Sequence, residues 1–155
     1  MKVLKFGGTS VGSEKNIKQV ISILNDYSEK DNVIAVVSAV GGITNKLLKA
    51  GELAKIQNLE YVSVYEEIHG THIELIKALI PNNNDEIVNN TISNLQSLKQ
   101  LLDGIYLIHE ISPSTTDKLS SYGELLSSQI IAEAMRYQKL DAQVKNSQEL
   151  IVTDD

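Results

Sequence analysis

A lysine, two glycines and two hydroxyl residues stand together near the start of the chain, in the segment Lys5-Phe6-Gly7-Gly8-Thr9-Ser10. Glycine lets the oxygens of a phosphate group approach backbone N–H groups closely, and such N–H groups bind anions. The lysine adds a positive charge, and the two hydroxyl groups add hydrogen bonds. These residue types at this spacing therefore indicate a phosphate-binding turn. A tight turn that requires glycine only for its backbone angles is the alternative, which the sequence leaves open.

Three known phosphate-binding motifs do not describe this turn. A dinucleotide fingerprint, G-x-G-x-x-G, requires glycine where Thr9 stands. A Walker A loop requires Gly-Lys-Ser or Gly-Lys-Thr after its second glycine, and this segment lacks that sequence. The spacing of a protein-kinase glycine-rich loop does not fit either. The segment is therefore interpreted as a phosphate cradle of another design.

Two further segments carry polar side chains in a related setting. Ser38-Ala39-Val40-Gly41-Gly42-Ile43-Thr44-Asn45 is a second glycine turn, and Ser121-Tyr122-Gly123-Glu124 presents a carboxylate within a helical pattern. Each residue has a simpler interpretation when it is taken alone: Lys5 as a solvated lysine, Thr44 as a helix N-cap and Glu124 as an exposed carboxylate. Their occurrence together favours a shared site.

The elements that must position these residues begin with a βαβ unit. The apolar run in residues 1–6 predicts a strand that ends at the first turn. Ser13 is a suitable N-cap for a following helix, whose predicted buried face consists of Ile17, Val20, Ile21, Leu24 and Tyr27. Residues 33–37 are apolar without alternation, which predicts a strand covered on both faces in a parallel sheet. Both glycine turns would then lie at the carboxyl ends of parallel strands, where such sheets bind ligands.

The remainder of the chain is predicted to be mainly helical. Periodic apolar residues indicate helices around 47–56, over 61–80 and from about Asp85, the last with a buried face of Val88, Ile92, Leu95, Leu98, Leu102 and Ile105. The S-x-x-D sequence of Ser114–Asp117 predicts a capping box for a helix through about Tyr137, with Leu119, Leu126, Ile130 and Ala134 on its buried face. Residues 142–145 and 150–152 are predicted to be extended. So few strands beside so many helices indicate a fragment of a larger domain.

Composition and charge exclude several classes of function. The 155 residues include 14 Lys plus Arg and 20 Asp plus Glu, a formal net charge of −6, which argues against nucleic-acid or anionic-membrane partners. No cysteine is present, so disulfide scaffolds, zinc-thiolate sites and cysteine nucleophiles are excluded. No apolar run approaches the roughly 20 residues of a spanning helix and no signal peptide is recognisable, so we expect a cytoplasmic protein. His69 and His72 are interpreted as packing residues, and no protein metal site is expected.

The three polar segments, taken in order, resemble the sequence signatures of aspartokinases. Residues 5–12 are similar to the N-terminal signature of that family, residues 38–45 to its second glycine turn and residues 121–124 to a third block. The resemblance covers the whole chain. It implies that residues 1–155 are the N-terminal portion of an amino-acid-kinase catalytic domain, an α/β fold built as a three-layer αβα sandwich. Residues 102–108 look more like the kinase part of bifunctional aspartokinase/homoserine dehydrogenases than like the stand-alone enzymes.

The resemblance also implies an activity. Aspartokinases convert ATP and L-aspartate into ADP and 4-phospho-L-aspartate, with Mg²⁺, in the first step toward lysine, threonine and methionine. By position in the family signatures, Lys5 would face the transferring phosphoryl group, while Gly7, Gly8, Thr9 and Ser10 would bind phosphate oxygens. Ser38, Thr44 and Glu124 would contact aspartate.

The family's later segments, which include those for the nucleoside, would lie beyond Asp155. We therefore expect the isolated chain to be inactive, and to self-associate through an uncovered sheet edge. Two alternatives stay open. One is another kinase of the same fold, acting on glutamate, acetylglutamate, carbamate or a nucleotide. The other is a non-catalytic interaction module that retains the fold.

Overall fold

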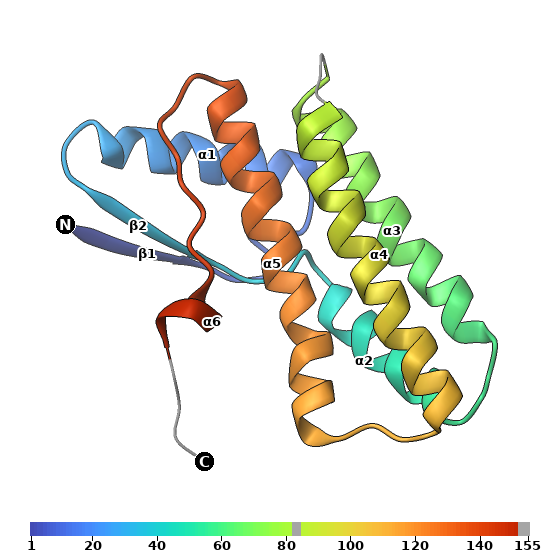
Figure 1. The fold of residues 1–155 in the computed structure, drawn as a ribbon. Helices are drawn as coiled ribbons and strands as arrows, with labels where there is room; N and C mark the ends of the chain where they lie inside the picture. The colour runs from blue at the N-terminus through green and yellow to red at the C-terminus, as the bar shows by residue number, and fades with distance from the viewer. Residues whose placement is uncertain (82–84, 152–155) are drawn as a thin grey trace.

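The computed structural model describes residues 1–81 and 85–151. It begins with strand β1 (Lys2–Phe6), helix α1 (Glu14–Ser28) and strand β2 (Val33–Val37). The two strands pair in parallel, with Lys2 opposite Val33 and Phe6 opposite Val37. Helix α1 connects them and packs against β2 (Figure 1). The predicted βαβ unit and the α/β class are therefore confirmed, and each strand ends at a glycine turn.

Helix α1 begins where the sequence predicts. Ser13 is its N-cap, and the Ser13 Oγ accepts a hydrogen bond from the backbone N–H of Asn16 at 3.2 Å. The predicted face is buried except at Tyr27, which is 37% exposed. Tyr27 lies in the last turn of the helix, where the Lys2 Nζ sits 4.7 Å from the centroid of its ring. This cation–π contact lies at the surface, so the predicted burial of Tyr27 is wrong.

Only one face of the sheet is covered in the part of the chain that the structure describes. Leu4, Phe6, Val33 and Val37 pack against the helical core. On the opposite face, the exposed fractions are 61% for Val3, 47% for Ile34 and 46% for Val36. The prediction that residues 33–37 are covered on both faces is therefore wrong for the described residues. Their sequence does not alternate because apolar side chains occupy both faces, although the described helices pack on one alone.

Four long helices form the remaining layer: α2 (Ile43–Lys55), α3 (Glu60–Leu79), α4 (Asp85–Ile108) and α5 (Pro113–Tyr137). Helix α5 stands between the sheet and the α3–α4 pair (Figure 1). The predicted faces of α4 and α5 are buried at Leu95, Leu98, Leu102, Ile105, Leu119, Leu126, Ile130 and Ala134. Ile92 is half-buried, and the side chain of Val88 lies outside the described residues. No helix in the described ranges is both long and apolar enough to cross a membrane.

Helix α5 begins earlier than the capping box predicts. Its N-cap is Ser112, whose Oγ accepts a hydrogen bond from the backbone N–H of Thr115 at 3.1 Å. Pro113 follows at the first helical position, where its fixed φ suits a helix and its missing N–H costs nothing. The prediction of a cap at Ser114 is therefore wrong, because the proline signal outweighs the S-x-x-D pattern.

The chain after α5 does not form the predicted strands. Residues 142–145 belong to no helix or strand, and residues 147–150 form the short helix α6 (Ser147–Leu150). The Arg136 Nε donates a hydrogen bond to the backbone oxygen of Ala142 at 2.8 Å, which takes an acceptor that a strand ladder would use. Val152 lies outside the described residues. Apolar sequence alone does not make a strand, because a strand also requires a neighbour with which to pair.

Candidate functional site

The first glycine turn connects β1 to α1 and closes on its own backbone. The oxygen of Gly7 accepts hydrogen bonds from the N–H groups of Ser10 at 2.9 Å and Val11 at 3.3 Å. The side-chain amide of Asn16 donates to the oxygen of Thr9 at 2.7 Å and so fastens the turn to the helix. Among the described residues, none accepts a hydrogen bond from the N–H groups of Gly8 or Thr9. These two N–H groups are therefore free to bind an anion.

The second glycine turn connects β2 to α2. The N–H of Ser38 donates to the oxygen of Phe6 at 3.0 Å, which extends the sheet contact beyond β2. Gly42 is the N-cap of α2, with a left-handed φ of 81°. Thr44 therefore lies inside the first turn of the helix, and the simpler interpretation of Thr44 as an N-cap is wrong. Ser38 and Thr44 are half-buried, and their hydroxyl groups have no hydrogen-bond partner in the described parts of the chain.

The two glycine turns lie in backbone contact. An added Cβ at Gly8 would stand 3.3 Å from the oxygen of Ala39, and one at Gly41 would stand 3.4 Å from the Cα of Gly12. Gly42 is the one described glycine with positive φ, so backbone angles do not explain the other glycines of the turns. Gly8, Gly12 and Gly41 permit close packing, whereas a Cβ at Gly7 would meet nothing within 4 Å. The open space at Gly7 favours the approach of a ligand over the alternative of a purely conformational turn.

Helix α5 brings the third polar segment against the second turn. The Glu124 Oε1 accepts a hydrogen bond from the backbone N–H of Ala39 at 3.2 Å. The Ser127 Oγ, one helical turn later, donates to the oxygen of Ser38 at 2.8 Å. The two elements approach this closely because of Gly123, where an added Cβ would stand 2.6 Å from the Cβ of Ala39. Sequence reasoning found Glu124 but missed Ser127, because its acceptor, the Ser38 carbonyl, lies 89 positions away in the chain.

Positive charge at the site comes from Lys5. This residue is exposed, and its ammonium group has no hydrogen bond or ion pair with any described residue. Lys46, the other lysine close to a glycine turn, is paired with Glu67 at 2.8 Å between Nζ and Oε2. The hydrogen bond and charge of Lys46 hold the pKa of the Glu67 carboxyl below its usual value. Lys5 is therefore the lysine that stays available to an incoming anion.

The structure thus brings the predicted residues together in two groups. The glycine turns and Glu124 form one continuous assembly, while Lys5 precedes the first turn on the uncovered face of the sheet, in register with Val36. A pocket of about 240 Å³ adjoins both turns on the side of α3. It is lined by Gly12, Glu14, Val40, Thr71, Glu74, Leu75 and Ala78.

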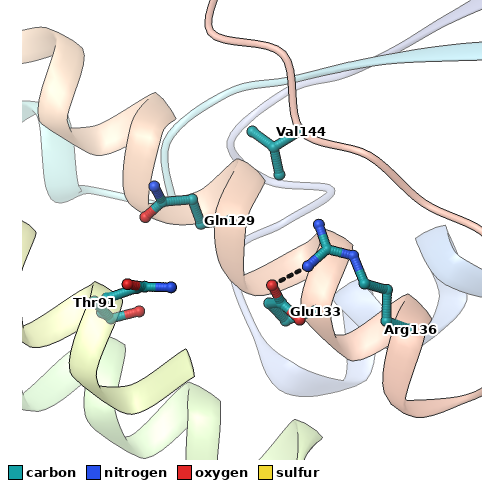
Figure 2. Close-up of a pocket in the computed structure, with 6 residues that line it drawn as sticks. Thr91, Gln129, Glu133, Arg136 and Val144 are labelled. Carbon is teal, nitrogen blue, oxygen red and sulfur yellow. Dashed lines mark hydrogen bonds and ion pairs between the residues drawn. The ribbon is translucent and has the colours of Figure 1, made fainter. Parts of the chain in front are cut away.

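A second pocket, of about 170 Å³, lies between α4, α5 and the segment after α5 (Figure 2). The two charged residues of this pocket, Arg136 and Glu133, form an ion pair with each other, and Arg136 also donates a hydrogen bond to the backbone oxygen of Ala142. The Gln129 Oε1 accepts a hydrogen bond from Asn94 at 2.9 Å. Arg136 therefore holds the segment after α5 against the helix, and we assign no ligand to this pocket.

Comparison of the sequence with known protein families identifies the family of this chain. The model of the amino acid kinase family matches residues 1–151. The chain belongs to the amino acid kinase family. Aspartokinase 1, chloroplastic, of Arabidopsis thaliana is 38% identical over 99% of the chain and 27% of that relative. The aspartokinase of Candida albicans is 33% identical over 96% of the chain and 28% of the relative.

This amino acid kinase chain is also similar in sequence to bifunctional enzymes, and similar in structure to a solved aspartokinase. The bifunctional aspartokinase/homoserine dehydrogenase 2 of Escherichia coli is 28% identical over 95% of the chain and 18% of that relative. The structure of E. coli aspartokinase III in complex with aspartate and ADP has a TM-score of 0.78 and 30% identity, over 91% of the chain and 30% of that structure. The resemblance to aspartokinases and the α/β class of the amino-acid-kinase fold are confirmed. The chain spans less than a third of the length of these relatives.

Proposed function

We propose that this chain is the part of an aspartate kinase that holds the reacting groups. The reaction transfers the γ-phosphoryl group of ATP to the side-chain carboxylate of L-aspartate and yields ADP and 4-phospho-L-aspartate. The observation that carries the proposal is the assembly of two glycine turns in backbone contact with the Glu124 carboxylate on the second. This assembly stands in a chain that is similar over 91% of its length to an aspartokinase solved with aspartate and ADP.

The first turn is suited to the phosphate groups. The free N–H groups of Gly8 and Thr9 would donate hydrogen bonds to phosphate oxygens, which the open space at Gly7 lets approach, with the Thr9 and Ser10 hydroxyls beside them. Lys5 would neutralise the phosphoryl group as it is transferred. We assign no residue of this chain to the nucleoside.

The second turn is suited to aspartate. The hydroxyls of Ser38 and Thr44 are unpartnered among the described residues and would bind its carboxylates. One oxygen of Glu124 is occupied by the Ala39 N–H, and the other would pair with the substrate's α-ammonium group. A carboxylate directed at the phosphoryl group would oppose the reaction, so this assignment also agrees with the sign of the charges.

The chemistry requires charge neutralisation rather than a general base. An aspartate carboxyl has an ordinary pKa near 3.9, so it is already an anion at pH 7 and ready to attack. The difficulty is its repulsion by the phosphates, and each charge contact at ~4 Å is worth several kcal/mol at an effective dielectric constant near 20. Lys5 and the backbone N–H groups of the first turn reduce this repulsion.

Mg²⁺ is expected to accompany the nucleotide. Among the side chains that the structure describes, no group of three or more His, Asp or Glu is placed to hold a metal ion. We therefore place no metal ligand on the described residues.

The test is trapping of the acyl phosphate with hydroxylamine. The full-length protein that carries this chain is incubated with ATP and L-aspartate, with L-glutamate, or with no amino acid. We expect aspartate to give at least about tenfold more hydroxamate than glutamate, because one extra methylene group in a substrate typically changes kcat/KM by about 10–200-fold. Hydroxamate from glutamate alone would support another kinase of the same fold. Binding of aspartate or nucleotide without turnover would support a non-catalytic module.

A further inference from the structure

The peptide bond between Ser38 and Ala39 is held at both of its polar groups by one turn of α5. Ser127 donates to the carbonyl oxygen at 2.8 Å, and the N–H donates to Glu124 at 3.2 Å. These C=O and N–H groups belong to one planar unit, so the two hydrogen bonds together fix the orientation of the plane. We refer to Glu124 and Ser127 with this peptide as the α5 clamp.

Two observations show that Ser127 is positioned to bond to the turn: its side chain is buried, and its shortest hydrogen bond is to the turn rather than to its own helix. Its exposed fraction is 1%. A serine inside a helix usually donates to a carbonyl of the preceding turn, and Ser128 does so, with Leu125 as its acceptor at 3.0 Å. Ser127 also has such an acceptor, the oxygen of Glu124 at 3.1 Å, but its shorter contact is the one to Ser38. The hydroxyl therefore links the helix to the turn.

The α5 clamp determines where the Ser38 side chain stands. The N–H of Ser38 is held by the oxygen of Phe6 at 3.0 Å, and the peptide that follows is held by α5. With both flanking peptides fixed, the direction of the Cα–Cβ bond of Ser38 is fixed as well. The close contact of Gly123 with Ala39 keeps the turn from moving toward the helix.

We propose that Ser127 is a positioning residue for the aspartate-binding turn. Its hydroxyl acts through the Ser38–Ala39 peptide, so that the Ser38 hydroxyl and the second oxygen of Glu124 are oriented before the substrate arrives. Such preorganisation strengthens binding because the ordering cost is met during folding. The identity of the substrate in this inference depends on the proposed function, whereas the α5 clamp itself depends only on the hydrogen bonds described above.

The experiment compares Ser127→Ala with the matched control Ser128→Ala in the full-length protein. Hydrogen–deuterium exchange is followed by mass spectrometry on a peptide that covers residues 37–42. We expect Ser127→Ala to speed exchange in this peptide by about tenfold, because the Ser38 carbonyl loses its buried donor and the peptide plane can rotate. Ser128→Ala removes only a bond within the helix and is expected to leave the exchange unchanged.

Steady-state kinetics provide the second measurement. Ser127→Ala is expected to raise the KM for aspartate by about tenfold, equivalent to about 1.4 kcal/mol, and to leave the KM for ATP within about twofold. Ser127→Cys retains a weak donor of similar size and should fall between the wild type and Ser127→Ala. If Ser127→Ala does not fold, Ser127→Cys carries both measurements.

The outcomes separate this inference from the proposed function. Wild-type exchange and wild-type aspartate KM in Ser127→Ala would overturn the positioning role. An equal rise in both KM values with a lowered Tm would also overturn it, because a general packing defect would then be the cause. If the wild-type protein does not phosphorylate aspartate, the proposed function fails, and the exchange measurement alone decides whether the α5 clamp exists.

Discussion

At the scale of single residues, some charged side chains near the glycine turns form ion pairs or hydrogen bonds within the chain, and others have no such partner among the described residues. Lys5 has no partner among the described residues, whereas Lys46 is paired with Glu67. Glu124 uses one oxygen for the Ala39 N–H, and its other oxygen has no partner among the described residues. These states suit a cation that acts on the phosphoryl group and an anion that binds an ammonium group. They also make the two roles separable by kinetics.

Lys5→Ala is expected to lower kcat by about 10²-fold in the full-length protein, while the KM for aspartate changes much less. The reason is that the lysine charge is worth most when phosphoryl charge develops in the transition state. Steady-state kinetics measure the change. Lys46→Ala is the matched control, because Glu67 already neutralises that lysine. An unchanged kcat in Lys5→Ala would remove Lys5 from the mechanism.

Glu124→Gln is expected to raise the Kd for aspartate by about tenfold or more and to leave nucleotide affinity near the wild-type value. The amide oxygen can still accept the Ala39 N–H, but the charge that would pair with the α-ammonium is gone. Calorimetric titration of aspartate and nucleotide separates the two effects. Glu133→Gln, farther along α5, is the control. Equal losses for both ligands would instead indicate a folding defect.

At the scale of elements, the contact between α5 and the second turn depends on the absence of a side chain at Gly123. Gly123→Ala would place a methyl group 2.6 Å from the Cβ of Ala39. We expect a net loss of about 1–2 kcal/mol in the free energy of unfolding, because overpacking outweighs the helix propensity gained from alanine. Urea denaturation of the full-length protein measures it.

Gly104→Ala in α4 is the matched control for this change. Gly104 is also a helix residue, but an added Cβ there meets nothing within 4 Å. Its expected effect is a gain of about 0.5–1 kcal/mol. Destabilisation of similar size by both substitutions would show that close packing at Gly123 is not the cause.

The buried His72 of α3 makes the stability of the helical layer depend on pH. The ring is fully buried; its Nδ1 lies 2.7 Å from the oxygen of Ile68 and must donate, and its Nε2 has no partner among the described residues. Burial lowers the pKa of His72, although the hydrogen bond to Ile68 opposes the shift. The unfolded chain therefore binds the proton more readily, and stability is lost as pH falls below the ordinary histidine pKa of about 6.5.

The expected slope from this one group is at most about 1.4 kcal/mol per pH unit below that value. Urea denaturation between pH 7.5 and pH 5 measures it, and His72→Gln should flatten the dependence. His109→Gln, which lies outside α3 and is exposed, is the control. A pH dependence that persists unchanged in His72→Gln would place its origin elsewhere.

Local sequence patterns predicted most of the helices and strands correctly. Contacts between segments far apart in the sequence could not be predicted from such patterns. The Ser13 cap, the βαβ unit and the faces of α4 and α5 follow from spacing along the chain. Glu124 could be found because a carboxylate in a polar block is visible in the sequence. The role of Ser127 depends on a contact with a carbonyl 89 positions away, which no local pattern encodes. The failed strands after α5 have the same cause, because pairing requires a partner elsewhere.

At the scale of the whole molecule, the described helices cover only one face of the sheet. Under the proposed function, the described residues also supply groups for the phosphates and aspartate, but none is assigned to the nucleoside. The opposite sheet face exposes Val3, Ile34 and Val36, and the chain spans about 30% of the aspartokinase III structure that it matches. Self-association through the sheet stays a prediction, as does the assignment of residues 1–155 to the N-terminal part of a catalytic domain.

The isolated chain of residues 1–155 is expected to form no detectable aspartyl phosphate. Transfer requires both reactants to be held within a fraction of an ångström, and the groups assigned here hold the phosphates and aspartate but not the nucleoside. Hydroxylamine trapping of the isolated chain beside the full-length protein measures the difference. Comparable turnover in the two samples would show that these residues suffice for catalysis.

The contact between the two glycine turns has a consequence for the thermodynamics of binding. The two turns pack so closely that a Cβ added at Gly41 would stand 3.4 Å from the Cα of Gly12 and 3.5 Å from the oxygen of Gly8, so we expect a backbone change in one turn to displace the other. A nucleotide that orders the first turn would then alter the free energy with which aspartate binds at the second. By linkage, aspartate must alter nucleotide affinity by the same factor. Under the proposed function, nucleotide and aspartate would thus act as reciprocal effectors, coupled through a close backbone approach that glycine permits.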